Sequence, residues 1–265
     1  RQRTKGKGQK AKSKIRDFFI AFCPLPFAFC PLPFAFCLLP FKKIPVSNSP
    51  SDKRLPYQFI AIEGNIGVGK TTLCHRLAER FGCSLVLEQF TDNPFLPPFY
   101  EQPERYAFPV ELFFMTERHK QLLEHFGSPD LFTPFTVADY FFVKTLLFAK
   151  NNLSEEEFRL FQRLFGVLNA TFPKPELLLY LHRPVDVLLR QIRQRGREIE
   201  RNISAAYLEE IQNAYFDYLK SEKETPVVIL ELGDADFQHN DQTLEFIIDL
   251  LGAPHEDGVS YHKLK

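Results

Sequence analysis

Phe59-Ile-Ala-Ile-Glu-Gly-Asn-Ile-Gly-Val-Gly-Lys-Thr-Thr72 is the stretch that decides the fold. An apolar run leads into a glycine-rich segment and then into a helical pattern, and Gly64, Gly69, Lys70 and Thr71 complete the spacing G-x-x-x-x-G-K-[ST]. Glycines allow backbone N–H groups to turn inward around a phosphate, and the helix that follows points its positive end at the same anion. We therefore expect this stretch to bind a nucleoside triphosphate.

Each residue of the loop has an expected part in that binding. Lys70 is long enough to reach the β- and γ-phosphates, and the Thr71 hydroxyl is placed to ligate Mg²⁺. The predicted ATP-binding residues of the loop are Gly64, Asn65, Ile66, Gly67, Val68, Gly69, Lys70, Thr71 and Thr72.

The charge of the chain is divided unevenly. Residues 1–55 hold 12 Lys and Arg against two acids, whereas residues 56–265 hold 21 against 31, so the net charge of zero is a cancellation. Such asymmetry is typical of a tail beside a globular domain. We predict a disordered basic leader at 1–55 and one domain at 56–265.

The leader contains a near-repeat of seven residues that begins Ala21-Phe-Cys-Pro-Leu-Pro-Phe27. Its prolines exclude a coiled coil, because each one removes a helix donor and clashes with the preceding turn. Two interpretations stay open, a targeting peptide and a recently duplicated stretch that is functionless or not native to the protein, and we favour the second.

The composition also bears on where in the cell the protein works and on what it binds. No apolar run approaches the ~20 residues that span a membrane, and the five cysteines form no disulfide framework. We expect a cytoplasmic protein that binds neither membranes nor nucleic acid, since the domain is acidic and residues 1–16 lack interleaved aromatic side chains.

Strands and helices alternate along the domain, which predicts an α/β fold with a parallel sheet. The expected strands are 57–62, 84–87, 135–138, 176–181 and 226–230. The expected helices are 70–81, 104–126, 141–150, 154–172, 185–195, 205–220 and 242–251, and 91–98 is expected to be a loop. The prediction is a P-loop kinase fold with a five-stranded parallel sheet flanked by helices.

Acidic residues follow the first three strands, at the sheet edge where α/β proteins bind ligands. Glu88 is placed to accept a proton from a hydroxyl that attacks the γ-phosphate. Asp139 is placed to hold Mg²⁺ with Thr71, and Glu63 is expected to be structural. Acids at strand ends also cap loops and helices, but two of them beside a phosphate loop favour phosphoryl transfer.

An arginine cluster surrounds Gly196, where a helix can break into a mobile loop. A solvated helix face is the common explanation of such a run. Here the arginines also suit a lid that closes over a phosphoryl group in transfer. The cluster consists of Arg190, Arg193, Arg195 and Arg197.

With these motifs in order, residues 57–251 resemble the deoxynucleoside kinases, and most closely the bacterial deoxyguanosine/deoxyadenosine kinase branch. The motifs that carry the resemblance are the phosphate loop, Glu88 with Asp92-Asn-Pro-Phe-Leu96, Phe99-Tyr100 before Pro103, Ala138-Asp139-Tyr140, Phe172-Pro-Lys-Pro175, Arg195-Gly-Arg197 with Glu200, and Asp234-Ala-Asp-Phe237.

The resemblance implies a role for each of these residues. Glu88 would be the general base, with Lys70, Arg195 and Arg197 as the other catalytic residues. Asp236 and Phe237 would pack on the donor adenine, and a homodimer is implied through helices 107–126 and 141–150. From periodicity alone, these two helices could equally belong to the core. The implied substrate-binding residues are Glu88, Tyr100, Glu111, Arg118, Asp139 and Glu200.

The predicted activity is ATP-dependent, Mg²⁺-assisted phosphorylation of the 5′-hydroxyl of a purine deoxynucleoside. Glu111 stands where many relatives have a base-reading glutamine; a carboxylate only accepts hydrogen bonds, and guanine offers two adjacent donors, so deoxyguanosine is favoured over deoxyadenosine. Many relatives have an arginine where this chain has Tyr140. The candidates for stacking on the base are Phe95, Phe108, Phe113 and Phe114, although core packing is the commoner role of phenylalanine at helical spacing.

Two other functions are weighed against this one. A nucleoside monophosphate kinase of the thymidylate kinase kind would need a further phosphate-binding arginine after the second or third strand, where Glu88 and Asp139 stand. A P-loop switch without catalysis would not need a base, a magnesium-binding acid and a lid.

Overall fold

The computed structural model describes residues 55–89, 93–128 and 132–264. The seven-residue repeat and residues 1–54 of the predicted disordered leader lie outside the described residues, whereas Leu55, the last residue of that leader, packs in the core.

A parallel sheet of six strands forms the centre of the domain, in the order β2-β3-β1-β4-β5-β6. The strands are β1 (Phe59–Gly64), β2 (Ser84–Val86), β3 (Thr136–Ala138), β4 (Leu177–His182), β5 (Pro226–Glu231) and β6 (Gly258–Lys263). The prediction of a parallel α/β sheet is confirmed.

The predicted number of five strands is wrong, because β6 was not expected. This strand lies at the edge beyond β5, and its sequence Gly-Val-Ser-Tyr-His-Lys has no apolar run. An edge strand faces solvent along one side, so polar and charged residues are acceptable there. Backbone pairing with β5 and the Lys263–Glu231 ion pair of 2.8 Å hold it instead.

The helices agree with the predicted ones to within three residues at each end, with one exception. Residues 91–98 were expected to be a loop, but α2 begins at Leu96, with Pro97 in its first turn, where a missing N–H costs nothing. The helices are α1 (Lys70–Phe81), α2 (Leu96–Glu101), α3 (Pro103–Gly127), α4 (Lys144–Asn152), α5 (Glu155–Asn169), α6 (Val185–Arg195), α7 (Ala205–Ser221) and α8 (Asp241–Gly252), with the 3-10 turn η1 (Glu198–Glu200).

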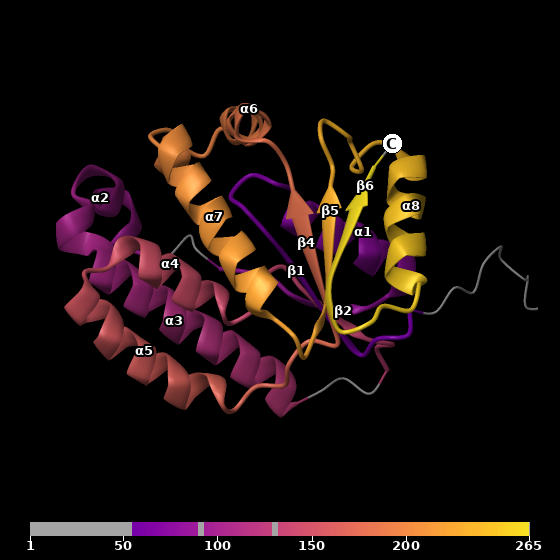
Figure 1. The fold of residues 1–265 in the computed structure, drawn as a ribbon, viewed down its shortest axis with the longest axis horizontal. Coiled ribbons are helices and arrows are strands. Elements are labelled where there is room, and N and C mark those ends of the chain that lie inside the picture. The colour runs from indigo at the N-terminus through magenta and orange to yellow at the C-terminus, as the bar shows by residue number, and fades with distance from the viewer. Residues whose placement is uncertain (1–54, 90–92, 129–131, 265) are drawn as a thin grey trace, which may run out of the picture. The chain divides into compact units, whose positions relative to one another are not determined.

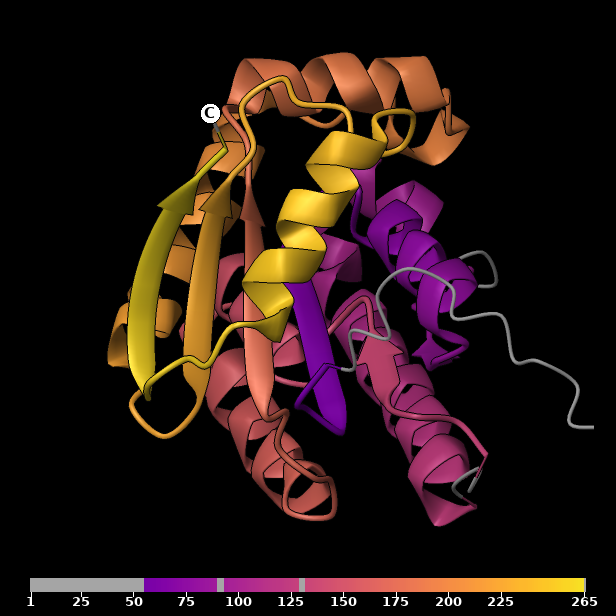
Figure 2. The same cartoon turned by 90° about the vertical axis from the view of Figure 1, so that its right-hand side faces the viewer.

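Helices cover both faces of the sheet. Figure 1 shows α1 and α8 on one face and α3, α4 and α7 on the other, with α5 outside α3 and α4. Figure 2, turned by 90°, shows the strands side by side behind α8. Within the described ranges, no helix is long and apolar enough to cross a membrane.

The register of the strands determines which side chains meet at the carboxyl edge. Ala138 of β3 pairs with Ala61 of β1 on one side and with Val86 of β2 on the other. The residues that follow these strands therefore emerge beside the phosphate loop that follows β1. Glu88 and Asp139 are brought to the same edge in this way.

Candidate active site

The phosphate loop joins β1 to α1. Gly69 has a φ of 103°, a left-handed conformation that favours glycine, and caps the N-terminus of α1. The Lys70 ammonium donates to the carbonyls of Gly64 at 2.8 Å and Asn65 at 3.0 Å, so it lies over the loop. Burial, followed by the positive charge of Lys144, lowers the pKa of Lys70 to about 8.

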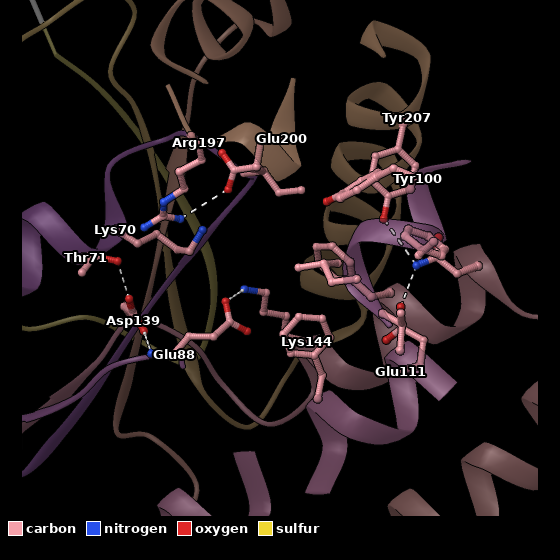
Figure 3. A pocket seen from close by; sticks show the side chains of 18 of the residues that line it. Lys70, Thr71, Glu88, Tyr100, Glu111, Asp139, Lys144, Arg197, Glu200 and Tyr207 are labelled. Atoms are coloured by element: carbon pink, nitrogen blue, oxygen red, sulfur yellow. Dashed lines mark hydrogen bonds and ion pairs between the residues drawn. The ribbon is translucent and has the colours of Figure 1, made fainter. Parts of the chain in front are cut away.

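The carboxylate of Glu88 is held between two cations from different helices. Arg118 of α3 donates to Oε1 from Nε at 2.9 Å and from Nη2 at 2.5 Å. Lys144 of α4 donates to Oε2 at 2.6 Å (Figure 3). Burial by itself would raise the pKa of Glu88, but the charges of Lys144 and Arg118 outweigh it and hold the pKa well below its usual range.

Thr71 and Asp139 form an oxygen pair at the start of α1. The Thr71 hydroxyl donates to Asp139 Oδ2 at 2.5 Å, and the Glu88 amide donates to Asp139 Oδ1 at 2.7 Å. Mg²⁺ prefers oxygen ligands and commonly takes one or two from the protein and the rest from phosphates and water. The pair fits such an ion, and no group of three or more His, Cys, Asp or Glu that would bind a metal occurs among the described residues.

Glu63 takes a structural position. Its Oε1 accepts from the Phe141 amide at 2.6 Å and its Oε2 from the Tyr215 hydroxyl at 2.8 Å. The side chain is buried and does not line the cavity that Lys70, Glu88 and Asp139 border.

The other end of the cavity is built around Glu111 of α3. The Asn152 amide donates to Glu111 Oε1 at 2.6 Å and to the Tyr207 hydroxyl at 3.3 Å, whereas Glu111 Oε2 is buried and has no partner in the described part of the chain. Burial raises the pKa of Glu111 to about 7; Asn152, Arg118 and Lys144 partly oppose the rise and Glu88 adds to it.

The arginine segment lies over the cavity. Gly196 ends α6 with a φ of 69°, and the chain then turns into η1. Arg195 makes a short ion pair with Glu200, and Arg197 reaches the same carboxylate at 3.3 Å. Tyr100 of α2 lines the cavity with them, and burial raises the pKa of its hydroxyl.

All predicted catalytic and substrate-binding residues line this one cavity. Of the four phenylalanines proposed for stacking, Phe114 lines it; Phe95, Phe108 and Phe113 are not among its lining residues. The lining residues that sequence reasoning missed include Lys144, Asn152, Tyr207, Phe99 and Phe148.

Lys144 had a signal in the sequence, because it interrupts the apolar run Phe141-Phe-Val-Lys-Thr-Leu-Leu-Phe148. A charged residue within such a run is buried and must find a partner. Asn152 and Tyr207 had no such signal, because only the packing of α4 and α7 places them at the cavity.

A second cleft lies on the other side of the phosphate loop, lined by Asp236 and Phe237. A Cβ on Gly69 would lie 2.7 Å from the Phe237 ring, so glycine is needed for this contact. Asp236 turns its carboxylate back to its own loop, where it accepts from the amides of Gln238 and His239.

Arg183, which follows β4, connects this loop to the phosphate loop and was not predicted. Its guanidinium is buried and donates to the carbonyls of Val68 at 3.3 Å, Gly233 at 2.7 Å and Ala235 at 2.6 Å. One side chain therefore ties the two segments that line the second cleft.

Tyr140, which replaces the arginine of many relatives, is buried in the core. Its hydroxyl donates to Gln121 at 3.0 Å. The cations at Glu88 come instead from Arg118 and Lys144.

A sequence model of the deoxynucleoside kinase family matches residues 60–253. The chain belongs to the deoxynucleoside kinase family. It is therefore a phosphotransferase, and the family resemblance inferred from its motifs is confirmed.

Two relatives of this kinase come from Bacillus subtilis. A deoxyguanosine kinase is 34% identical over 71% of this chain and 93% of its own length. A deoxyadenosine/deoxycytidine kinase is 32% identical over 75% of this chain and 94% of its own length.

Solved structures support the fold. A deoxyadenosine kinase from M. mycoides with products dCMP and a flexible dCDP bound has a TM-score of 0.62 at 22% identity, covering 73% of this chain and 98% of the other. The same enzyme with dATP bound has a TM-score of 0.61.

We predict that Arg183→Met weakens use of the phosphate donor. The carbonyls of Val68, Gly233 and Ala235 lose their donor, so the second cleft loosens while the first keeps its contacts. The KM for the nucleotide phosphate donor should rise by at least about tenfold, and the KM for the nucleoside should change by less than about threefold. Steady-state kinetics with each substrate varied in turn measures this split, and equal changes in the two KM values would contradict it.

Proposed function

We propose that this kinase transfers the γ-phosphoryl group of ATP to the 5′-hydroxyl of a purine deoxynucleoside, with deoxyguanosine favoured over deoxyadenosine. One observation carries the proposal: two cavities meet at the phosphate loop, and Gly67, Gly69 and Arg195 line both. The cavity with Glu88 and Glu111 would take the nucleoside, and the cleft with Phe237 would take the donor base.

Glu88 would act as the general base. A carboxylate with a lowered pKa is a weak base, but phosphoryl transfer passes through a loose transition state in which the hydroxyl proton leaves late. The position of the Glu88 carboxylate then matters more for the rate than its basicity. Arg118 and Lys144 support this role because they fix both carboxylate oxygens.

Thr71 and Asp139 would hold Mg²⁺ together with the phosphates of the donor. When bound, the ion neutralises charge on the phosphate oxygens. The contact between the two side chains at the start of α1 supports this assignment.

The lid residues would act on the phosphates and the sugar. Arg195 and Arg197 can move from Glu200 to the transferring phosphoryl group, since arginine binds carboxylate and phosphate with the same geometry. Tyr100 and Glu200 border the cavity between its two ends and would hold the 3′-hydroxyl of a deoxyribose. Lys70 would reach the donor phosphates.

Glu111 would choose the base. Its Oε2 is an acceptor without a partner, buried at the end of the cavity away from the phosphate loop (Figure 3). An ionised carboxylate can accept from N1–H and the exocyclic amine of guanine together. Adenine lacks the N1–H donor, so it would be bound less well by the ionised form. Phe114 and Arg118 line the same region and would pack beside the base.

The two alternative functions fit the site less well. A monophosphate acceptor would attack through a phosphate oxygen that has no hydroxyl proton to give up, so the ionised Glu88, held by Arg118 and Lys144, would have no role as a base. A switch without catalysis would leave the nucleoside cavity and its buried acceptor on Glu111 without a use.

We predict that ATP turnover depends on an added deoxynucleoside. A coupled assay with four deoxynucleosides should give the highest kcat/KM with deoxyguanosine, then deoxyadenosine. Glu88→Gln should lower kcat by about 10²-fold to 10⁴-fold, because the amide cannot take the proton. ATP hydrolysis at the same rate without any nucleoside would refute kinase activity.

We also predict that pH changes the choice of base. Above a pH of about 7 Glu111 is ionised and reads guanine; below it, the protonated carboxyl can donate to adenine N1 and accept from its amine. The ratio of kcat/KM for deoxyguanosine to that for deoxyadenosine should therefore rise as pH increases through about 7.

Glu111→Gln is the matched variant for this measurement. Glutamine has one donor and one acceptor face at every pH, so the ratio should become flat with pH and should fall by about tenfold at pH 8. A ratio in the unaltered kinase that does not change between pH 6 and 8, or an unchanged guanine preference in the variant, would overturn the role of Glu111.

A homodimer is proposed on the basis of exposed apolar side chains. They follow one face of α5 at Leu160, Leu164 and Val167, with Leu123 exposed on α3. The face expected from the sequence included helix 141–150, but Lys144, Thr145, Leu147 and Ala149 of α4 are buried. The exposed side chains therefore favour a dimer interface formed by α3 and α5.

We predict that Val167→Glu weakens the dimer by at least about tenfold. Sedimentation equilibrium measures the association. Gln162→Glu, which adds the same charge on another face of α5, is the control and should leave the dimer intact. A chain that is monomeric before any substitution would contradict the proposal.

We further propose a reducing, cytoplasmic setting for this kinase. The free, buried thiols of Cys74 and Cys83 support it, and fractionation of cells that express the chain would test it.

A further inference from the structure

Lys144 is a buried lysine at the start of α4. Its side chain is 6% exposed, and the Phe148 ring centre lies 5.5 Å from its ammonium. An ammonium in such surroundings is costly unless it has anionic or hydrogen-bonding partners. The buried ammonium therefore needs such partners, and the partners that it has indicate the role of Lys144.

The contacts of Lys144 leave part of its capacity unused. A protonated ammonium has three N–H donors, and within the described part of the chain Lys144 gives one hydrogen bond, to Glu88 Oε2 at 2.6 Å. Arg118 already supplies two hydrogen bonds to Glu88 Oε1. One carboxylate thus faces two cations, and two donors of Lys144 remain for a ligand in the cavity.

The other nearby acid does not take these donors. Glu63 is an electrostatic neighbour of Lys144, but its two oxygens accept from the Phe141 amide and the Tyr215 hydroxyl. Lys144 lines the cavity, whereas Glu63 does not. The unused donors of Lys144 are therefore within reach of a ligand in that cavity.

Two lysines line the cavity on the side where it meets the phosphate loop. Lys70 comes from the loop and Lys144 from α4, and Figure 3 shows the Lys144 ammonium pointing toward Lys70, with the Glu88 carboxylate beside the Lys144 ammonium. After burial, the positive charge of Lys144 is the next cause that lowers the pKa of Lys70. Two ammonium groups that act on each other favour a further anion, and in the proposed function a phosphoryl group passes from donor to acceptor here.

We propose that Lys144 is a catalytic residue whose ammonium binds the phosphoryl group during transfer and then the 5′-phosphate of the product. This inference rests on the proposed function. In the step, the 5′-oxygen forms a bond to the γ-phosphorus while the bond from that phosphorus to the bridging oxygen breaks. The bonding electron pair leaves with ADP, and the hydroxyl proton goes to Glu88. Lys144 keeps its own protons and donates two hydrogen bonds.

The alternative is that Lys144 only positions Glu88. A positioning residue would affect kcat, but it would not bind a phosphate. The affinity for the product monophosphate, compared with that for the nucleoside, therefore separates the two roles. The nucleoside lacks the 5′-phosphate and has the same base and sugar.

The test compares Lys144→Met, Lys144→Arg and Lys150→Met in the full chain. Lys150 is an exposed lysine on the same helix and serves as the control. Lys144→Met should lower kcat by about 10²-fold. It should weaken calorimetric binding of deoxyguanosine 5′-monophosphate by about tenfold or more, and binding of deoxyguanosine by less than about threefold.

Rescue distinguishes charge from packing. Lys144→Arg should restore monophosphate binding to within about threefold of the unaltered kinase. Lys150→Met should match the unaltered kinase in every measurement. If Lys144→Met does not fold, as judged by thermal melting, Lys144→Gln replaces it, since glutamine can donate to Glu88 without a charge.

Equal losses of nucleoside and monophosphate affinity in Lys144→Met, or an unchanged kcat, would overturn the catalytic role while leaving the kinase activity in place. An unaltered chain with no nucleoside-dependent turnover would instead refute the proposed function, and this inference with it.

Discussion

The ion pairs at Glu88 connect the chemistry of the site to the packing of the domain. Glu88 follows β2 at the carboxyl edge of the sheet, Arg118 comes from the middle of α3, and Lys144 begins α4. A buried carboxylate without partners would take up a proton. Because its two oxygens are fixed by two helices, the carboxylate stays ionised and α3 and α4 are fixed against the edge of the sheet. Removing one partner would leave a charge without compensation, which is costly in the interior.

The same cavity holds a second carboxyl group, that of Glu111, whose pKa is raised where that of Glu88 is lowered. Glu111 has the Asn152 amide as its hydrogen-bonding partner, and burial dominates its protonation. Glu88 has two cationic partners, and their charges dominate. Two acids of similar intrinsic strength thus acquire different protonation behaviour from their surroundings, which is the usual way in which one site separates a reacting group from a recognising one.

The parts that sequence predicted are those that depend on local chemistry. The phosphate loop, α1 and α6 follow from glycine spacing and apolar periodicity, and the acids at strand ends follow from the rule for parallel sheets. β6 was missed because an edge strand needs no apolar run, and α2 because prolines in a first turn look like a loop.

The unpredicted part of the site depends on contacts between distant elements. Asn152 and Tyr207 meet Glu111 only because α4 and α7 pack together, and Arg183 reaches three carbonyls in two separate loops. No spacing along the chain encodes such contacts. Lys144 is intermediate: its burial could be inferred from the apolar run around it, but its pairing with Glu88 could not.

A crystal structure of the kinase with deoxyguanosine and a non-hydrolysable ATP analogue tests the central claim most directly. The account predicts the guanine edge within hydrogen-bond distance of Glu111 Oε2 and the 5′-hydroxyl within hydrogen-bond distance of Glu88. It also predicts the adenine of the analogue beside Phe237. A nucleoside bound in the other orientation, or with its 5′-hydroxyl away from Glu88, would contradict it.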